Sequence, residues 1–352
     1  MDTIIIKTIN GIIREEDLDK AANILQKGGL VAFPTETVYG LGADALSSEA
    51  SKKIYKAKGR PSDNPLIVHI ADPKHMEIIA RDIPRKAYKL AQVFWPGPLT
   101  MILNKKDNVP YGTTGGLDTV AIRLPASKIA KDLIARSGGF IAAPSANVSG
   151  KPSPTSAQHV IDDLNGKVDM IIDGGKSTLG LESTIVDLSS GEVIILRPGC
   201  ISLSMLENVI GEVRYDEAVL LNKQEKNVIP KAPGMKYRHY APEGSLTIYE
   251  GDIQRVAQAI NDAANKYIKD GKSVGIIATE ETKDLYKYGS IQMIGSRKDN
   301  DSIAAGLYGV LRSFDDIHTE YIFSESFANG DLGQAIMNRL LKAAGYKVVK
   351  VD

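Results

Sequence analysis

Polar side chains follow directly on a short apolar run near the start of the chain. Residues 30–33 form a pattern typical of a buried strand, and Pro34 begins a polar segment that includes Thr35. In α/β folds, groups at the ends of strands line the binding crevice. A turn that only closes a strand has the same composition, so both interpretations of Thr35 stay open at this point.

The next polar stretch is basic and stiff. A helix predicted at 48–58 ends at Lys58, and the segment that follows carries Arg60, Ser62 and Asn64 between two prolines that keep it extended. Cations at the end of a helix can simply complement its dipole. That explanation does not account for the polar strip after the helix. Since arginine offers a fork to phosphate oxygens and lysine a point charge, the strip predicts binding of a polyanion such as a nucleotide triphosphate.

Two strands place a polar side chain on a face that is otherwise apolar. In the strand predicted at 66–70, Ile67 and His69 share one face; in the strand predicted at 120–124, Ala121 and Arg123 share one. A histidine in such a place is more often a satisfied core residue than a ligand. Arg123 could reach a carboxylate or form a surface salt bridge, and both interpretations remain open.

Ser145 and Asn147 follow a further predicted strand that begins at residue 140. Both residue types favour turns. They would also supply neutral hydrogen-bonding groups to a nucleotide phosphate or ribose. The glycine-rich stretch at 111–119 lacks a phosphate-loop motif, so we expect a flexible loop there.

Composition narrows the class of protein. The 352 residues exceed one typical domain, and 43% hydrophobic and 24% charged content are ordinary for a globular protein. The chain has 43 basic and 43 acidic residues, and this zero net charge argues against a protein whose main task is to bind nucleic acid. The single cysteine, Cys200, excludes an internal disulfide, and there is no signal peptide or long apolar run. We therefore expect a cytoplasmic protein without a membrane segment.

The element pattern predicts an α/β protein with three parts. Residues 1–217 should form a twisted mixed sheet with helices, in which strands 168–173 and 182–188 pair across a turn. Residues 152–155 should open a helix, with Ser153 or Thr155 as its cap. Residues 218–244 lack hydrophobic periodicity, which predicts a linker. Over residues 245–352 strands and helices alternate, and this pattern predicts an open, Rossmann-like α/β domain.

Five short motifs occur here in the order found in a known family. They are PTETVYGL at 34–41, KGR at 58–60, WPGPLT at 95–100, TVAIRLP at 119–125 and PSANVSG at 144–150. Together they resemble the YrdC-like family of threonylcarbamoyl-AMP synthases, whose signature is a Lys-x-Arg plus Ser-x-Asn pair. The linker and second α/β domain resemble the longer, two-domain form of that family.

The resemblance implies a nucleotidyltransferase that makes threonylcarbamoyl-AMP and pyrophosphate from L-threonine, bicarbonate and ATP. A separate transferase would then move the threonylcarbamoyl group to an adenosine in tRNA. Mg²⁺ should assist, bound mainly through the phosphates of ATP. The threonine site implied by the resemblance consists of Thr35, His69, Arg123 (on the carboxylate) and Ser183. The implied nucleotide site consists of Lys58, Arg60, Ser62, Asn64, Ser145, Asn147, Arg197 and Tyr237.

Several points stay open at the level of sequence. His69 could be a base for the threonine amine or a hydrogen-bond partner of the substrate. Residues 233–242 could fold over the site as a lid. Other functions compatible with the sequence are formation of a carbamoyl adenylate, as in related domains of hydrogenase-maturation proteins, or RNA binding. Zero net charge and the absence of interleaved aromatic and basic residues in the first domain count against the RNA module, and we expect no stable nucleic-acid binding.

Overall fold

The computed structural model describes residues 2–220, 231–233, 239–327 and 330–351. The chain divides into two compact units. The first contains Met1–Ser149, Ser153–Thr178 and Glu182–Lys236, and the second contains Gly150–Pro152, Leu179–Leu181 and Tyr237–Asp352. No helix among the described residues is long and apolar enough to cross a membrane.

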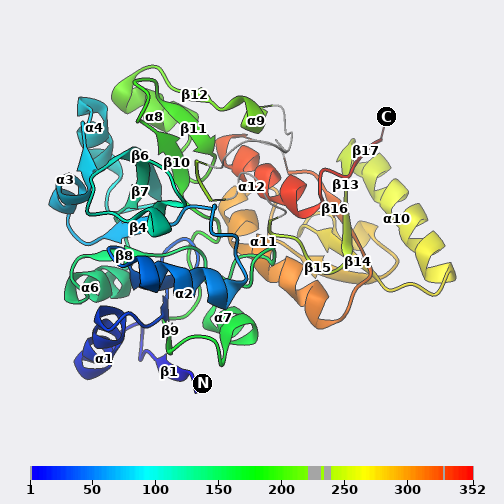
Figure 1. The fold of residues 1–352 in the computed structure, drawn as a ribbon. Helices are drawn as coiled ribbons and strands as arrows, with labels where there is room; N and C mark the ends of the chain where they lie inside the picture. Colours follow the sequence, from blue (N-terminus) through cyan, green and yellow to red (C-terminus); the bar gives the residue numbers. More distant parts are fainter. Residues whose placement is uncertain (1, 221–230, 234–238, 328–329, 352) are drawn as a thin grey trace. The chain divides into compact units, whose positions relative to one another are not determined.

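The first unit is built on a mixed sheet of twelve strands in the order β1-β9-β2-β3-β8-β4-β7-β6-β10-β11-β12, with β5 paired to β6 (Figure 1). Its strands are β1 (Ile4–Lys7), β2 (Val31–Phe33), β3 (Gly40–Asp44), β4 (Ile67–Ile70), β5 (Ala80–Arg81), β6 (Leu99–Lys105), β7 (Thr119–Arg123), β8 (Phe140–Ala142), β9 (Met170–Asp173), β10 (Thr184–Asp187), β11 (Ile194–Arg197) and β12 (Arg214–Tyr215). Parallel and antiparallel pairs alternate irregularly, so the prediction of a mixed sheet is confirmed.

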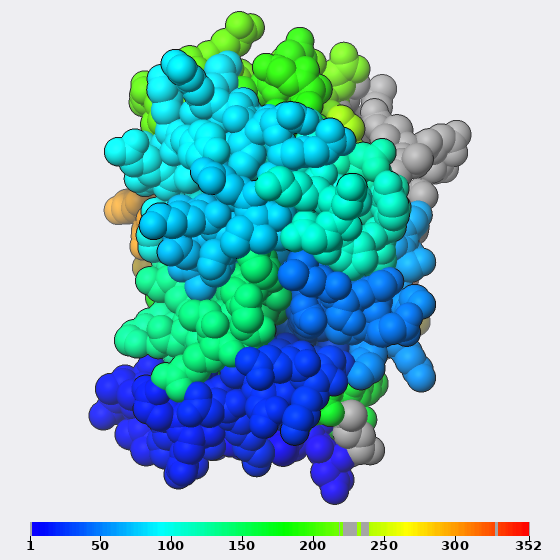
Figure 2. All heavy atoms as spheres, turned by 60° about the vertical axis from the view of Figure 1, so that its left-hand side comes forward, coloured from blue at the N-terminus to red at the C-terminus, as the bar shows by residue number. Residues whose placement is uncertain are grey.

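Helices cover this sheet through two separate hydrophobic clusters. They are α1 (Glu15–Gln26), α2 (Ser48–Lys58), α3 (Met76–Ile79), α4 (Arg85–Phe94), α5 (Tyr111–Thr114), α6 (Lys128–Arg136), α7 (Ala157–Leu164), α8 (Leu203–Ile210) and α9 (Glu217–Leu220), with a 3₁₀ turn at Pro73–His75. One cluster joins α1 and α6 to β2, β8 and β9, and the other joins α2, α4, α7 and α8 to the opposite face. Figure 2 shows α1 (dark blue) and α6 (green) side by side, where Arg136 forms ion pairs with Glu15 and Asp19.

Helix α2 matches the sequence prediction because both of its ends are specified locally. The Ser47 side chain accepts a hydrogen bond from the Ala50 amide at 3.2 Å and caps the N-terminus. Gly59 ends the helix with φ of +62°, a left-handed conformation that costs glycine little. The polar strip that begins at Arg60 therefore starts at a defined point.

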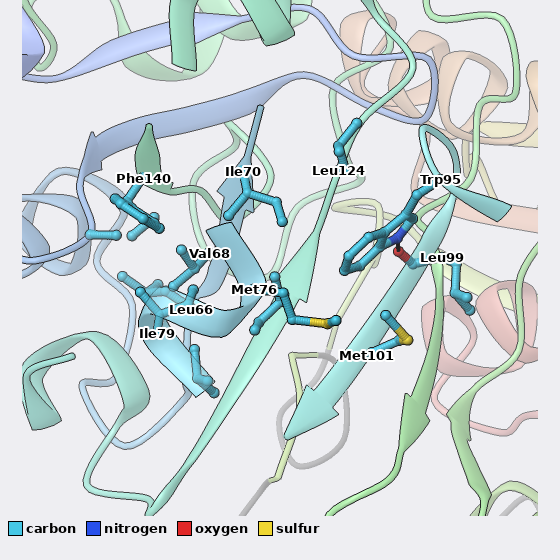
Figure 3. Packing of buried hydrophobic residues seen from close by; sticks show 14 of the residues in the cluster. Leu66, Val68, Ile70, Met76, Ile79, Trp95, Leu99, Met101, Leu124 and Phe140 are labelled. Atoms are coloured by element: carbon cyan, nitrogen blue, oxygen red, sulfur yellow. Dashed lines mark hydrogen bonds between the residues drawn. The ribbon is translucent and has the colours of Figure 1, made fainter. Parts of the chain in front are cut away.

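The central strands have one apolar face and one partly polar face, as alternation predicts. Leu66, Val68 and Ile70 pack into the large cluster with residues of β6 and β7 (Figure 3). Trp95 anchors this packing: it is 7% exposed, and its indole N–H donates to the Leu99 carbonyl at 2.8 Å. The opposite face carries Ile67, Ala121 and Ile102, with the polar side chains described below. At these central strands one face thus packs into the large cluster, and the polar side chains of the candidate site lie on the other.

The second unit contains an all-parallel sheet in the order β15-β14-β16-β13-β17. Its elements are β13 (Ser245–Gly251), α10 (Ile253–Lys269), β14 (Val274–Ala278), a 3₁₀ turn (Lys283–Leu285), β15 (Ser290–Met293), α11 (Asn300–Asp316), β16 (Tyr321–Glu325), α12 (Gly330–Ala343) and β17 (Val348–Val351). Helix α10 packs on one face through Val256 and Ile260, and α11 packs on the other, where Phe314 lies against Gly275. The predicted open α/β domain is confirmed.

Several local predictions are wrong. Strand β10 pairs with β6 and β11 instead of with β9, because the segment between β9 and β10 crosses to the far half of the sheet. Residues 40–44, for which no strand was predicted, form β3, since burial and pairing on both sides outweigh the weak strand propensity of glycine. The predicted loop at 111–119 contains the short helix α5. Ser156, rather than Ser153 or Thr155, caps α7. Helix α8 was not predicted.

Candidate active site

A row of buried polar side chains crosses the face of the central strands opposite the large hydrophobic cluster. Strand pairing sets His69 of β4 opposite Arg123 of β7, and Arg123 opposite Thr100 of β6. Ser183, just before β10, and Arg197, at the end of β11, continue the row. All five residues are 4% exposed or less. Beside the row lies a small apolar cluster of Ile67, Ala121, Ile102, Ile185, Leu196 and Ala232.

Arg123 is held by the turn between β2 and β3. Its Nη2 donates to Glu36 Oε1 at 2.6 Å, its Nη1 donates to Thr37 Oγ1 at 2.9 Å, and its Nε donates to the Gly97 carbonyl at 3.3 Å. The alternative of a surface salt bridge is therefore wrong: the ion pair exists, but its side chains are only 5% and 11% exposed. Although burial raises the pKa of the Glu36 carboxyl, the charge of Arg123 and a hydrogen bond from the Ala126 backbone hold that pKa below its ordinary value.

His69 is a buried, neutral histidine. Its ring lies edge-on to Phe33 with centroids 6.4 Å apart, and Nδ1 lies 3.2 Å from the Ile67 carbonyl. Burial, together with the charge of Arg123, lowers the pKa of His69 to about 3. The imidazole therefore carries no charge at neutral pH and is a weak base. Of the two roles left open by the sequence, a hydrogen-bond partner of the substrate fits this environment better than a general base.

Thr35 and Ser183 are tied to this row through hydroxyl networks. Thr35 Oγ1 lies 2.8 Å from Thr37 Oγ1 and donates to the Val38 carbonyl at 2.6 Å. Ser183 Oγ lies 2.7 Å from Thr100 Oγ1 and accepts from Arg197 Nη2 at 3.1 Å. Thr35 and Arg123 thus share one hydrogen-bond network through Thr37, and Ser183 belongs to a second one with Thr100. His69 lies opposite Arg123 across the strand pair but is bonded to neither network. Arg197, implied for the nucleotide, also belongs to this group.

The other nucleotide residues lie in two further places. The ammonium of Lys58, which is 2% exposed, donates to the carbonyls of Ser145 and Asn147 and, at 3.3 Å, to Asn147 Oδ1. Ser145 Oγ donates to the same Oδ1 at 2.5 Å. Ser145 also forms an isolated antiparallel β-bridge with Gly40 at the start of β3. The Ser145–Asn147 loop is therefore fixed against the β2–β3 turn. Lys58 in this structure holds the loop in place.

Arg60 bends back on its own segment. Its guanidinium donates to the Asn64 carbonyl at 3.3 Å and to the Pro65 carbonyl at 3.2 Å. Asn64 is 1% exposed, and its Oδ1 has no hydrogen-bond partner among the described residues, while Ser62 is exposed. An unpaired buried amide oxygen is costly unless a ligand or water satisfies it. Tyr237 lies outside the described residues, as do parts of the predicted linker and lid.

Glu36, Thr37 and Thr100 were not assigned a role from sequence. The available signals were proximity, since Glu36 and Thr37 follow Thr35, and alternation, since Thr100 is a polar residue at the start of an apolar strand. No group of three or more His, Cys, Asp or Glu side chains suited to a metal ion occurs in the described part of the chain.

Comparison with known proteins now identifies the family. Residues 23–199 match the Sua5/YciO/YrdC family model, described as "Telomere recombination", and residues 201–345 match the model of the threonylcarbamoyl-AMP synthase C-terminal domain. The threonylcarbamoyl-AMP synthase of Pyrococcus abyssi is 47% identical, over 99% of both chains. The chain belongs to the threonylcarbamoyl-AMP synthase family.

Other relatives agree with this membership. The threonylcarbamoyl-AMP synthase of Bacillus subtilis is 47% identical over 96% of this chain and 95% of its own. Among solved structures, the P. abyssi Sua5 protein complexed with L-threonine has a TM-score of 0.93 and 46% identity, over the full length of both chains. The resemblance to the two-domain threonylcarbamoyl-AMP synthases is therefore confirmed, and the chain is an enzyme of this kind.

Proposed function

We propose that this enzyme makes L-threonylcarbamoyl-AMP from L-threonine, bicarbonate and ATP, for the modification of adenosine in tRNA. The observation that carries the proposal is the buried guanidinium of Arg123, fixed beside neutral His69 on the polar face of the central strands. A fixed guanidinium suits an α-carboxylate, and the hydroxyls of Thr35 and Ser183 suit the remaining polar atoms of threonine. The P. abyssi relative solved with L-threonine supports threonine as the substrate.

The reaction requires positioning more than a covalent nucleophile. The threonine amine would bond to the carbon of CO₂ derived from bicarbonate and lose a proton, which gives a carbamate. A carbamate oxygen would then attack the α-phosphorus of ATP, and the bond from that phosphorus to the bridging oxygen of the β-phosphate would break to release pyrophosphate. Orientation of the two substrates and neutralisation of phosphate charge would account for most of the rate enhancement.

The nucleotide would lie over the apolar cluster beside the polar row. Ser145 and Asn147, held by Lys58, would border one side, and Asn64 would offer its unpaired Oδ1 to a donor on the nucleotide. Arg60 and Ser62 would need to turn toward the phosphates, and Arg197 would contact the nucleotide near Ser183. These assignments are proposals that rest on residue chemistry and on the resemblance.

Mg²⁺ would be bound mainly by the phosphates and water, because the described residues offer no acidic cluster for it. Its charge would neutralise the leaving pyrophosphate. The test of the whole proposal is pyrophosphate release with each of threonine, bicarbonate and Mg²⁺ omitted in turn. We expect release to require all three. Release that ignores threonine but needs carbamoyl phosphate would contradict the proposal.

A further inference from the structure

Arg123 has more hydrogen-bond donors than its neighbours use. A guanidinium carries five N–H groups. Among the described residues, one N–H on each of Nε, Nη1 and Nη2 is engaged, by Gly97, Thr37 and Glu36 respectively. One N–H on Nη1 and one on Nη2 therefore remain for a ligand. This count matches a carboxylate, which can accept from both terminal nitrogens at once.

Glu36 is the acidic side chain in contact with this guanidinium. Oε1 accepts from Arg123, and Oε2 accepts from the Ser127 amide at 3.3 Å, at the N-cap of α6. The backbone of Glu36 is held as well, since its carbonyl accepts from the Thr178 hydroxyl at 3.3 Å. The carboxylate is therefore fixed at both oxygens, next to the place where a ligand would meet Arg123.

The charge balance around Arg123 depends on Glu36. His69, which faces Arg123 across the strand pair, is neutral, and Thr37 and Thr100 carry no charge. With Glu36 present, the buried cation already has a counter-ion. Without it, Arg123 would be a buried charge that recruits an anion from solution, since unpaired buried charges are strongly unfavourable.

We propose that Glu36 is a positioning residue that fixes the Arg123 guanidinium for the substrate carboxylate and keeps small anions out of the threonine site. This inference rests on the proposed function, in which Arg123 binds the threonine carboxylate. An anion on Arg123 would lie close to the negative charge of Glu36. Threonine brings an ammonium group that offsets this repulsion, whereas acetate or bicarbonate brings nothing to offset it. The pair thus favours an amino acid over a simple carboxylate.

The test uses acetate, a carboxylate without an ammonium group, against the full-length enzyme. Threonine affinity is measured by calorimetry in sodium acetate and in sodium chloride at matched ionic strength. Wild type should show the same affinity in both salts. Glu36→Gln keeps the shape of the side chain but removes its charge, so acetate should compete with threonine for Arg123 in this variant. The apparent Kd for threonine should rise about tenfold when the acetate concentration is roughly ten times the Kd of acetate itself. The KM for ATP should not respond to acetate.

Glu36→Asp is the matched control, since it keeps the charge and shortens the side chain. It should remain insensitive to acetate even if its threonine affinity falls. A residue that only supports the fold would give Gln and Asp variants that respond to acetate alike, and this would overturn the inference. Acetate competition in wild type would overturn it too, without the need for any variant.

The two levels of the proposal fail in different ways. If acetate raises the melting temperature of Glu36→Gln but leaves threonine affinity unchanged, Arg123 binds anions but not threonine. That result would overturn the assignment of Arg123 to the substrate carboxylate and support the exclusion of anions by Glu36. If acetate has no effect on Glu36→Gln by either measure, the exclusion of anions is wrong and the assignment of Arg123 stands.

Discussion

Lys58→Met tests whether Lys58 holds the Ser145–Asn147 loop before any nucleotide binds. The sequence predicts only a phosphate contact for Lys58. In the structure its buried ammonium donates to two carbonyls and one side-chain amide of that loop. Methionine has a similar length and no donors, so the substitution removes these bonds with little change in volume.

The expected loss of stability follows from the contacts. Hydrogen bonds that involve a charged group each contribute about 1.5–3 kcal/mol, and buried acceptors left without a partner are costly. Methionine also removes the cost of burying a charge, which offsets part of the loss. We therefore expect the free energy of unfolding to fall by about 3 kcal/mol. For a domain of this size, that corresponds to a decrease of roughly 6–12 °C in melting temperature.

The assay is urea unfolding followed by tryptophan fluorescence without nucleotide. The sole tryptophan, Trp95, lies in the first unit, so its signal follows the unit that contains Lys58. Lys56→Met is the control, because Lys56 is exposed on the same helix and should change stability by less than about 0.5 kcal/mol. Equal midpoints for the two variants, with ATP affinity lost only in Lys58→Met, would show that Lys58 serves the nucleotide alone.

Three further predictions follow from other buried polar groups. Asn64→Leu should change stability by less than about 1 kcal/mol, because its Oδ1 has no partner to lose among the described residues. It should raise the KM for ATP about tenfold, and an unchanged KM would remove Asn64 from the nucleotide site. Ser183→Ala should raise the KM for threonine about tenfold and leave that for ATP unchanged, and the opposite pattern would reassign Ser183. His69 has a folded pKa of about 3 against an ordinary value near 6.5, so the unfolded chain binds the extra proton as pH falls. His69 should therefore lower stability by about 2 kcal/mol between pH 8 and pH 5, and His69→Gln should flatten this part of the pH profile measured by urea unfolding.

Local patterns predicted the elements that position the site. Alternation in β4 and β7 placed His69 and Arg123 on the face opposite the core, and the cap and stop residues of α2 fixed where the basic strip begins. These features depend on neighbours in the sequence, so they can be read from it. The second unit was predictable for the same reason, because its strands and helices alternate regularly.

Contacts between residues far apart in the sequence could not be predicted from such local patterns. The placement of β10 beside β6 and β11, and not beside β9, depends on which sheet edge is available after the rest of the chain has folded. The contact between Glu36 and Arg123 joins residues 87 positions apart, and no local periodicity indicates it. Lys58 shows the same limit: its residue type suits phosphate, but only the fold shows that its ammonium is directed at the Ser145–Asn147 loop.

The most direct test of the proposed function is the identity of the product. The enzyme is incubated with ATP, L-threonine, Mg²⁺ and ¹³C-labelled bicarbonate, and the adenylate formed is analysed by mass spectrometry. We predict an adenylate that contains one threonine and a single ¹³C atom, located in the carbamoyl group. An adenylate without threonine, or one whose carbamoyl carbon is unlabelled, would contradict the proposed function.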